Sequence, residues 1–500
     1  MMRYDTDTLP EPEIAPEFLS KNNGHAIAIP HDDDFQYHAL TESENGRILA
    51  KLIRSRARFN VTSGRWMFHD GKRFTQDDTG FVERYAKAVA RKTSQLMLAP
   101  PPDATDKEAY QFFKSTSKAS GIQAMMRLAQ TEPGISARMV DFDRDPFLFN
   151  TLDGTVDLQT GKIRAHSETD LITKLAPVNF NGAADCPLWK SFLNRAMAGN
   201  ETMIAYQRRL MGYALSADAS VQELWFFYGS GANGKSVFLD TISGMMGDYS
   251  GAAAPSLLTA STNEGHPTEI ADLAGKRLVF ASETEEGARL RVQLVKRLTG
   301  DAVLKARFMR QDFFEFPRTH KLIVVTNNVP TIRETSNAIW RRVRIVPFVV
   351  TIPPAEQDPQ LLVKLRAEWP GILNWCIAGC LDWQRNGMQT PEEVMIATDG
   401  YRQEQDVLAE FVAERCILAE DACVRPMELY ADYATWSKAI GDHQPLDRTS
   451  FNSRLRNVSG VREGTARIDG KPTRAIKGIE LKTVENEYRR SSASLSEDDL

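Results

Sequence analysis

The sequence predicts an α/β protein that is organised around a phosphate-binding loop. Residues 229–236 read GSGANGKS, which fits the pattern G-x-x-x-x-G-K-[ST] at every fixed position. An apolar aromatic run, residues 224–228, precedes the loop, and residues 237–239 continue it as the start of a helix. This is the strand–loop–helix context that a phosphate-binding loop requires.

Each residue type in the loop suits a nucleoside triphosphate. Glycines let backbone N–H groups approach phosphate oxygens, and the helix N-terminus adds a partial positive charge. We expect Lys235 to reach the β- and γ-phosphates and Ser236 to hold Mg²⁺. A glycine-rich turn that matches by chance would not explain the flanking strand and helix. The residues predicted to bind ATP are Gly229, Gly231, Asn233, Gly234, Lys235, Ser236 and Val237.

Composition limits the class of protein. A chain of 500 residues, 42% apolar and 25% charged, is typical of a soluble protein with two to four domains. It has no long apolar run and no apolar N-terminal segment, so we expect a cytoplasmic protein without a membrane span. Of five cysteines only Cys376 and Cys380 lie close together, with no histidine nearby, so no zinc site is predicted. With a net charge of −5, DNA contacts must come from local basic surfaces.

Five regions are expected along the chain: a disordered arm (1–40), an α+β accessory domain (41–185), an ATPase domain (186–390), a C-terminal domain (391–484) and a disordered acidic tail (485–500). In the accessory domain, the spacing predicts a helix from Thr41, a hairpin turning at Asp70 and Gly71, helical runs over 79–98 and 106–130, and short strands between 142 and 175.

An acidic strand follows the loop. Residues 276–283 read as a buried strand that ends in Glu283, and Glu285 lies two residues further on. An ATPase of this type needs a carboxylate at the end of a neighbouring strand, to hold Mg²⁺ or to orient the attacking water. Glu283 is the first candidate for both roles and Glu285 the second. The alternative is a strand that runs into a solvated acidic loop.

Two further candidates lie beyond it. The apolar strand 321–326 ends in Asn327, whose amide could position water beside the γ-phosphate, although an Asn-Asn pair also makes turns. Arg341 and Arg342 open another strand. An arginine supplied across a subunit boundary can stabilise transition-state charge by a factor of about 10³–10⁵. The alternative for this pair is a solvated basic edge.

A basic hairpin is predicted between these two strands. Residues 301–316 have apolar ends that flank Lys305, Arg307 and Arg310. Cations on a projecting hairpin can follow DNA phosphates whatever the base sequence. An ordinary charged surface hairpin fits the same residues.

The C-terminal domain reads as a winged helix. One helix spans 427–440, Asp447 or Thr449 caps a second, and residues 466–481 form a β-wing. Residues 424–482 hold 11 Lys/Arg against 7 Asp/Glu, a net charge of +4 in an acidic protein, which favours a DNA-facing surface. A protein–protein adaptor remains the alternative. The candidate DNA contacts are Arg454, Arg456, Lys471 and Arg474.

The order of these motifs resembles the superfamily 3 helicases. A closer resemblance is to the phage and plasmid replicative primase–helicase family, which includes the poxvirus helicase–primase. The matching text lies at 147–161, 229–236, 282–287, 319–321, 338–342 and 370–375, and the resemblance covers roughly 45 to 482. It implies an AAA+-like core that works as a ring, usually a hexamer, around DNA. It also implies an ATP-hydrolysing 3′-to-5′ DNA helicase in phage, prophage or plasmid replication, in a bacterial or phage-infected cell, acting on single-stranded and forked DNA.

One departure from the family concerns priming. Larger members carry a primase domain before this region, and we expect none here because too little sequence precedes it. The D-x-D of residues 141–143 matches family linker text rather than a primase metal site, so a separate primase or polymerase is the expected partner. One rival function is an initiator that uses ATP only as an assembly switch. Another is a nucleotide kinase, which gives no reason for the basic C-terminal domain.

Overall fold

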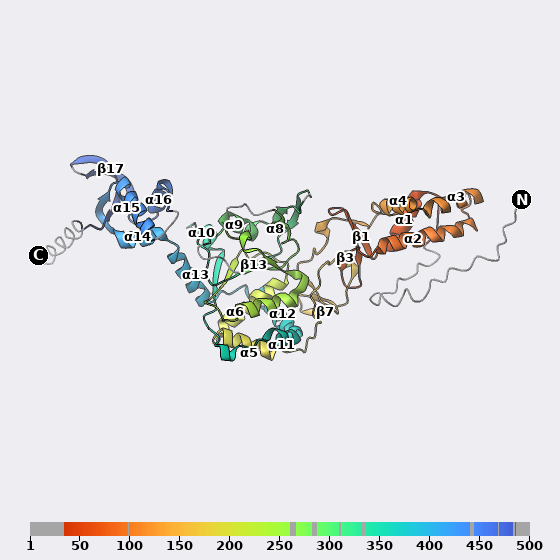
Figure 1. Cartoon of the computed structure of the whole chain (residues 1–500), viewed down its shortest axis with the longest axis horizontal. Coiled ribbons are helices and arrows are strands. Elements are labelled where there is room, and N and C mark those ends of the chain that lie inside the picture. The colour runs from red at the N-terminus through yellow and green to blue at the C-terminus, as the bar shows by residue number, and fades with distance from the viewer. Residues whose placement is uncertain are drawn as a thin grey trace. The chain divides into compact units, whose positions relative to one another are not determined.

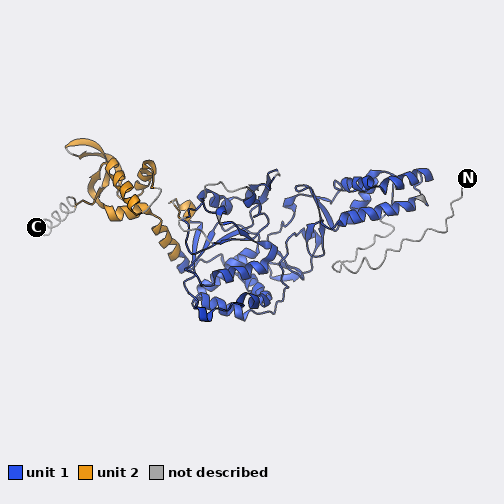
Figure 2. Cartoon of the chain, in the orientation of Figure 1, with its two compact units in different colours: residues 1–330, 341–395 blue, residues 331–340, 396–500 orange. Residues whose placement is uncertain are grey.

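The computed structural model describes residues 35–98, 100–260, 267–282, 288–309, 312–332, 334, 336–440, 445–468, 470–483 and 486. Several predictions concern residues outside these ranges. They are most of the N-terminal arm, the carboxylates Glu283 and Glu285, the hairpin cation Arg310, and most of the acidic tail. The described chain divides into two compact units (Figure 2), one of residues 1–330 and 341–395 and the other of residues 331–340 and 396–500.

The first unit begins with a helical cluster and a small sheet (Figure 1). Thr41 caps the first helix by accepting a hydrogen bond from the Glu44 amide, so the predicted helix start is confirmed. The sheet has the order β3-β2-β1-β4, and the predicted hairpin is the antiparallel pair β2–β3. The elements are α1 Glu42–Ile53, β1 Ala57–Asn60, β2 Arg65–His69, β3 Phe74–Gln76, α2 Phe81–Lys92, α3 Asp106–Thr116, α4 Ala119–Ala129 and β4 Ser136–Ala137.

The single helical run predicted over 106–130 was wrong, because the structure has two helices there. A capping box between Thr105 and Glu108 starts α3. At Lys118 the backbone is extended, with ψ 155°, and the chain turns back before α4. Gly121 allows the return, since a Cβ there would lie 2.4 Å from the Ser115 carbonyl oxygen. Helical spacing alone did not reveal this tight turn.

A three-stranded antiparallel sheet connects this region to the rest of the unit. It has the order β5-β6-β7 and consists of β5 Leu148–Asn150, β6 Thr155–Asp157 and β7 Lys162–Arg164, which confirms the short strands expected there. The Asn150 side-chain amide is buried and donates to the carbonyls of Lys72 and Lys174, at 2.9 and 3.1 Å. Phe149 stacks on Tyr249 with ring centroids 4.6 Å apart. These contacts join the N-terminal hairpin to the central sheet region.

The central sheet has five parallel strands in the order β14-β8-β13-β10-β9. Its middle strands are almost entirely buried, which explains why they read as continuous apolar runs in the sequence. The strand before the phosphate-binding loop, β8, lies between β13 and β14. The strands are β8 Leu224–Tyr228, β9 Ser250–Ala253, β10 Leu278–Ser282, β13 Lys321–Thr326 and β14 Val343–Pro347, and a separate hairpin is formed by β11 Val303–Ala306 and β12 Phe314–Pro317.

Helices cover this sheet and share its hydrophobic core, which contains Trp189, Trp225 and Phe238. Helices α6 and α12 cross very closely, because Gly212 and Gly379 stand at the crossing. A Cβ on Gly379 would lie 1.9 Å from the Arg208 carbonyl oxygen. The helices of this part are α5 Pro187–Ala196, α6 Glu201–Leu215, α7 Lys235–Met246, α8 Pro267–Ala271, α9 Val292–Gly300, α11 Leu361–Ala367 and α12 Trp369–Asn386.

The second unit contains a helical cluster and the three-stranded antiparallel sheet β15-β17-β16. Asp447 accepts hydrogen bonds from the amides of Thr449 and Ser450, so Asp447 is the helix cap that the sequence left open. The helix predicted over 427–440 is present as α15, and the hairpin predicted near 466–481 is present as the antiparallel pair β16–β17. The elements are α10 Asn337–Trp340, α13 Glu392–Glu404 (which begins in the first unit), α14 Val407–Arg415, β15 Cys416–Val424, α15 Pro426–Ala439, α16 Arg448–Leu455, β16 Arg462–Ile468 and β17 Lys471–Leu481. Within the described ranges, none of the helices has the length and apolar character needed to span a bilayer.

Candidate functional site

The phosphate-binding loop joins β8 to α7 through backbone geometry that favours glycine. Gly231 and Gly234 have φ of +103° and +84°, which L side chains rarely adopt. Gly229 is needed for a close approach, since a Cβ there would lie 2.3 Å from the Phe348 carbonyl oxygen. A Cβ on Gly234 would lie 2.9 Å from the ring of Phe192 on α5. The loop is therefore shaped by contacts that only small residues permit.

Lys235 is the first residue of α7 and is only 5% exposed. Its ammonium donates hydrogen bonds to the Gly229 carbonyl (2.7 Å), Asn233 Oδ1 (3.0 Å) and Asn327 Oδ1 (3.1 Å). All three recorded acceptors are neutral oxygens. Burial lowers the pKa of this amine. A desolvated cation bound by neutral acceptors at a helix N-terminus is an environment that attracts anions.

Residues around this lysine fit a triphosphate with Mg²⁺. Ser236 is exposed in the first turn of α7, so its hydroxyl is accessible to a metal ion. Asn233 holds the loop by donating to the Phe348 carbonyl at 3.2 Å, and Val237, in the first turn of α7, is half-buried. Glu283 and Glu285 lie outside the described residues. Their role in metal binding or water activation therefore stays a prediction. Over the described ranges no three His, Cys, Asp or Glu residues gather to hold a metal ion.

The structure brings Asn327 to the phosphate-binding loop. The strand before it, β13, lies between β8 and β10, and all three run parallel. The carboxyl ends of parallel strands meet at one edge of a sheet, where ligands bind. This topology explains the 3.1 Å contact between Asn327 and Lys235. Positioning of water by Asn327 stays a prediction.

Arg341 and Arg342 stand at the opposite edge of the sheet. Val343 pairs with Leu224 at the start of β8, whereas the loop leaves the far end of that strand. At 3.2–3.4 Å per residue the two edges are about 16 Å apart. Arg341 is exposed. Arg342 is 8% exposed and donates to Gln222 Oε1 at 3.1 Å, and burial, followed by the neighbouring Arg341 charge, lowers its pKa. Of the pair, Arg341 is therefore the better placed to reach another molecule.

The hairpin β11–β12 presents two of its three predicted cations. Lys305 and Arg307 are both exposed and lie over the ring of Phe313, at 5.4 and 5.1 Å from its centroid. Phe313 is itself 54% exposed. Cations beside an exposed aromatic ring suit a single strand, whose phosphates need charge and whose bases can stack. The sequence analysis placed Phe313 in an apolar end of the hairpin but did not predict it as a DNA contact.

The cations predicted as DNA contacts in the second unit differ in whether a carboxylate pairs with them. Arg456 and Arg474 both pair with Glu463, at 2.7 and 2.9 Å, and these bonds lower the pKa of that carboxyl. Lys471 is exposed at the start of β17. Arg454 lies on α16, the helix that also holds the buried Phe451. Arg462 and Arg467 are also exposed, on the strand β16, and the sequence analysis did not name them as DNA contacts.

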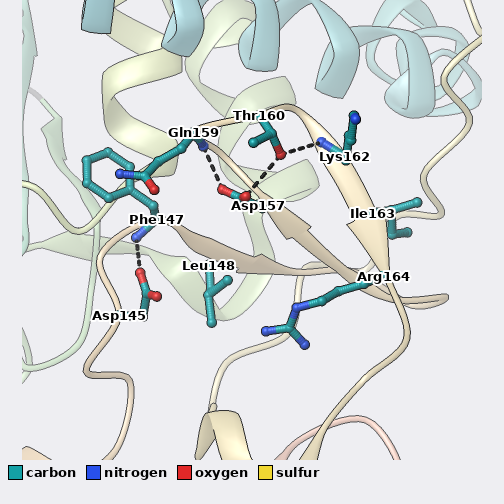
Figure 3. A pocket seen from close by; sticks show the side chains of 9 residues that line it. All are labelled: Asp145, Phe147, Leu148, Asp157, Gln159, Thr160, Lys162, Ile163 and Arg164. Carbon is teal, nitrogen blue, oxygen red and sulfur yellow. Dashed lines mark hydrogen bonds between the residues drawn. The ribbon is translucent and has the colours of Figure 1, made fainter.

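An open pocket lies elsewhere, on the β5-β6-β7 sheet (Figure 3). Its volume is about 390 Å³. The Asp157 carboxylate on its wall accepts hydrogen bonds from the Gln159 amide and the Thr160 hydroxyl, and Asp145 accepts one from the Phe147 amide. Arg164 pairs with Asp170. These polar groups stabilise local turns. No described residue of the phosphate-binding loop lines this pocket. The D-x-D carboxylates of Asp141 and Asp143 bind separate partners, Arg138 and Thr173.

Two family patterns match this chain. Residues 46–198 match the family described as D5 N terminal like, and residues 227–342 match a family of unknown function, DUF5906. "Putative helicase L207/L206" of Acanthamoeba polyphaga mimivirus is 21% identical over 436 residues, which cover 78% of this chain and 45% of that protein. "Primase D5" of fowlpox virus is 29% identical over 133 residues, covering 25% of this chain and 17% of that protein. The chain therefore carries a D5 N terminal like region and is similar to viral proteins named as helicases and as the D5 primase.

The resemblance predicted from the motifs is thereby confirmed. "Putative helicase 022R" of frog virus 3 is also similar, with 28% identity over 245 residues that cover 45% of this chain and 25% of that protein. The chain spans less than half the length of these relatives. Among solved structures, the C-terminal region of NrS-1 aligns with a TM-score of 0.46 and 12% identity, over 84% of this chain and 96% of that one.

The sequence analysis did not predict the residues outside the loop that contact it and fix its shape. Phe348 follows β14 and Phe192 lies on α5, more than a hundred and about forty positions from the loop. Both are ordinary apolar residues in the sequence. Their roles depend on contacts between distant segments, and no local spacing marks them.

Proposed function

We propose that this chain is an ATP- and Mg²⁺-dependent DNA helicase that acts in the replication of a virus, phage or plasmid. The observation that carries the proposal is the position of Lys235, at the N-terminus of α7 and bonded to both the loop and Asn327. Names of helicases and primases among its viral relatives support a nucleic-acid enzyme. We also propose 3′-to-5′ translocation and a separate primase or polymerase as partner.

The sheet order supports an AAA+-like superfamily 3 core. The strand β13 lies between β8 and β10, so Asn327, which follows β13, lies between the phosphate-binding loop and the end of β10 at Ser282. Lys235 would bind the β- and γ-phosphates, and Glu283, with Glu285 behind it, would prepare the attacking water. Ser236 would hold Mg²⁺, which would neutralise part of the phosphate charge. Asn327 would sense the γ-phosphate and help to orient the water.

Arg341 lies at the edge of the sheet opposite its own phosphate-binding loop. It could therefore contact a bound nucleotide only in a neighbouring subunit. Its own loop is about 16 Å away, at the other end of β8. A ring of identical subunits would place this edge against the loop of the next copy, so we propose a homo-oligomer, as a hexamer. ATP hydrolysis should then rise more than in proportion to protein concentration near the assembly threshold.

DNA would be contacted at two places. Lys305 and Arg307 with Phe313 form an exposed cation–aromatic surface on the hairpin β11–β12, and Arg310 extends the same basic segment in the sequence. In the second unit, the element order α14-β15-α15-α16-β16-β17, with β17 between the other two strands, supports a winged helix. Its helix α16 and wing would contact duplex DNA.

A forked-duplex unwinding assay tests this function. Strand displacement is expected with ATP and Mg²⁺. No displacement is expected with a non-hydrolysable analogue or with the Lys235→Ala chain. ATP-dependent assembly and DNA melting without processive displacement would instead support the ATP-switched initiator. Absence of ATP hydrolysis by the unchanged chain, with DNA and Mg²⁺ present, would contradict the helicase, and absence of ATP binding would contradict both functions.

A further inference from the structure

The residues that leave β14 run along the phosphate-binding loop. The Phe348 amide donates to the Tyr228 carbonyl at 2.7 Å, and the Ile352 amide donates to the Ala232 carbonyl at 2.7 Å. Asn233 Nδ2 donates to the Phe348 carbonyl at 3.2 Å. This strap, residues 348–352, is thus bonded to the loop at both of its ends.

Only the ends of the strap are anchored in this way. The Phe348 ring is buried against Phe227 and Phe238, with centroids 5.2 and 6.4 Å away. Val349, the next residue, is 79% exposed, one of the most exposed large apolar side chains of the described chain. Between the anchors, the backbone groups of residues 349–351 have no hydrogen bond to any residue in the described ranges. An exposed valine beside free backbone donors and acceptors therefore lies next to the loop.

The sheet order places the strap at one end of the expected triphosphate. In the proposed site the γ-phosphate lies beside Lys235 and Asn327, and Asn327 directly follows β13. The strap leaves β14, which lies on the other side of β8. Neighbouring strands are about 4.8 Å apart, so β13 and β14 are separated by about 10 Å. A nucleotide whose last phosphate lies near β13 extends its nucleoside toward β14.

We propose that residues 349–351 form the platform for the base of the bound nucleoside triphosphate. The inference rests on the proposed nucleotide site and assigns its base end. Val349 supplies an apolar contact to the base, and the free backbone N–H and C=O groups pair with its polar edge. Nucleotide and cofactor sites commonly combine apolar contact with a few backbone hydrogen bonds in this way. The strap is held by the loop itself, so the platform and the phosphate site form one rigid surface.

Calorimetric binding of ATP and of inorganic tripolyphosphate to the full chain tests the platform, because only ATP carries a base. Val349→Asn replaces the apolar contact without adding charge near the phosphates. Val61→Asn is the matched control, since Val61 is also exposed but belongs to the N-terminal region. Thermal unfolding of both variants should match the natural chain, because both side chains are exposed.

We expect Val349→Asn to weaken ATP binding about fivefold, a change of about 1 kcal/mol, and to leave tripolyphosphate binding within twofold. Val61→Asn should change neither. Equal loss for both ligands, or unchanged ATP affinity, would overturn the platform while the phosphate site stands. If the natural chain binds neither ligand, the nucleotide site itself is refuted, and the platform with it.

Discussion

Replacing Asn327 with aspartate tests how closely the loop lysine is matched to phosphate. The change puts a carboxylate where an amide oxygen now lies 3.1 Å from the Lys235 ammonium. Two unit charges at that distance attract by about 1 kcal/mol in a water-like dielectric and about 5 kcal/mol at an effective value of 20. Because Asn327 is exposed, the lower figure applies. The phosphate must displace this attraction between the introduced carboxylate and Lys235 in the variant. ATP binding by Asn327→Asp should therefore weaken roughly five- to tenfold.

The same substitution predicts a change in pH dependence. Burial lowers the pKa of Lys235, and its charged form is the one that binds phosphate. ATP affinity of the natural chain should therefore fall as pH rises through that lowered pKa, at a lower pH than for an ordinary lysine. A carboxylate partner raises the pKa of Lys235. In Asn327→Asp the decline should move to higher pH.

Calorimetric titration of ATP from neutral to alkaline pH measures both effects. Asn328→Asp is the matched control, because it adds the same charge at the next position, away from the recorded lysine contact. The reasoning is refuted if Asn327→Asp binds ATP as tightly as the natural chain. It is also refuted if Asn328→Asp weakens binding equally, since the loss would then not come from the direct contact.

Three further predictions concern stability and DNA binding. Gly379→Ala should destabilise the first unit by about 1–3 kcal/mol in chemical denaturation, because the added carbon meets helix backbone at 1.9 Å. Gly400→Ala, on α13 with open space around it, should instead stabilise by about 0.5–1 kcal/mol, and the same sign for both would contradict the packing argument. Asp447→Ala should cost about 1 kcal/mol in the same assay by removing the cap of α16, whereas Asp447→Ser should restore most of it. Glu463→Gln should release two arginines for phosphate and steepen the salt dependence of duplex binding measured by anisotropy; an unchanged slope would place those arginines away from DNA.

The sequence predicted the parts of the fold whose signals are local. Buried strands such as β13 are continuous apolar runs, and the phosphate-binding loop carries its own spacing of glycine and lysine. Caps and turns also have short-range signals, as Thr41 and the wing hairpin illustrate. Helix periodicity was less informative over 106–130, where Gly121 allows a turn that the apolar spacing does not mark.

Contacts between distant segments were not predictable from spacing. Arg277 opens an apolar strand, yet its guanidinium is buried and donates to the Leu215 and Leu148 carbonyls, at 2.5 and 2.8 Å, beneath a contact with the Tyr249 ring. Lys321 is similarly buried and donates to the Ser216 carbonyl. Both cations therefore satisfy carbonyls at or just beyond the C-terminal end of α6, a favourable place for positive charge. In the sequence they read only as the polar starts of strands.

The sequence also did not reveal that some of the predicted DNA contacts are paired with a carboxylate. Arg456 and Arg474 were predicted as DNA contacts, but Glu463 pairs with both of them. The register of β16 and β17 brings these groups together from separate elements. The net charge of a segment therefore does not show which of its cations are available to phosphate.

Mixing two inactive chains tests the central claim most directly, which is that Lys235 and the Arg341 of a neighbouring copy build one hydrolytic site. Lys235→Ala and Arg341→Ala chains should each hydrolyse ATP poorly alone. Random mixing in equal amounts joins an intact loop to an intact arginine at about a quarter of the interfaces, so about a quarter of the natural rate should return. A mixture that stays as inactive as its components, although both variants assemble, would contradict the shared site.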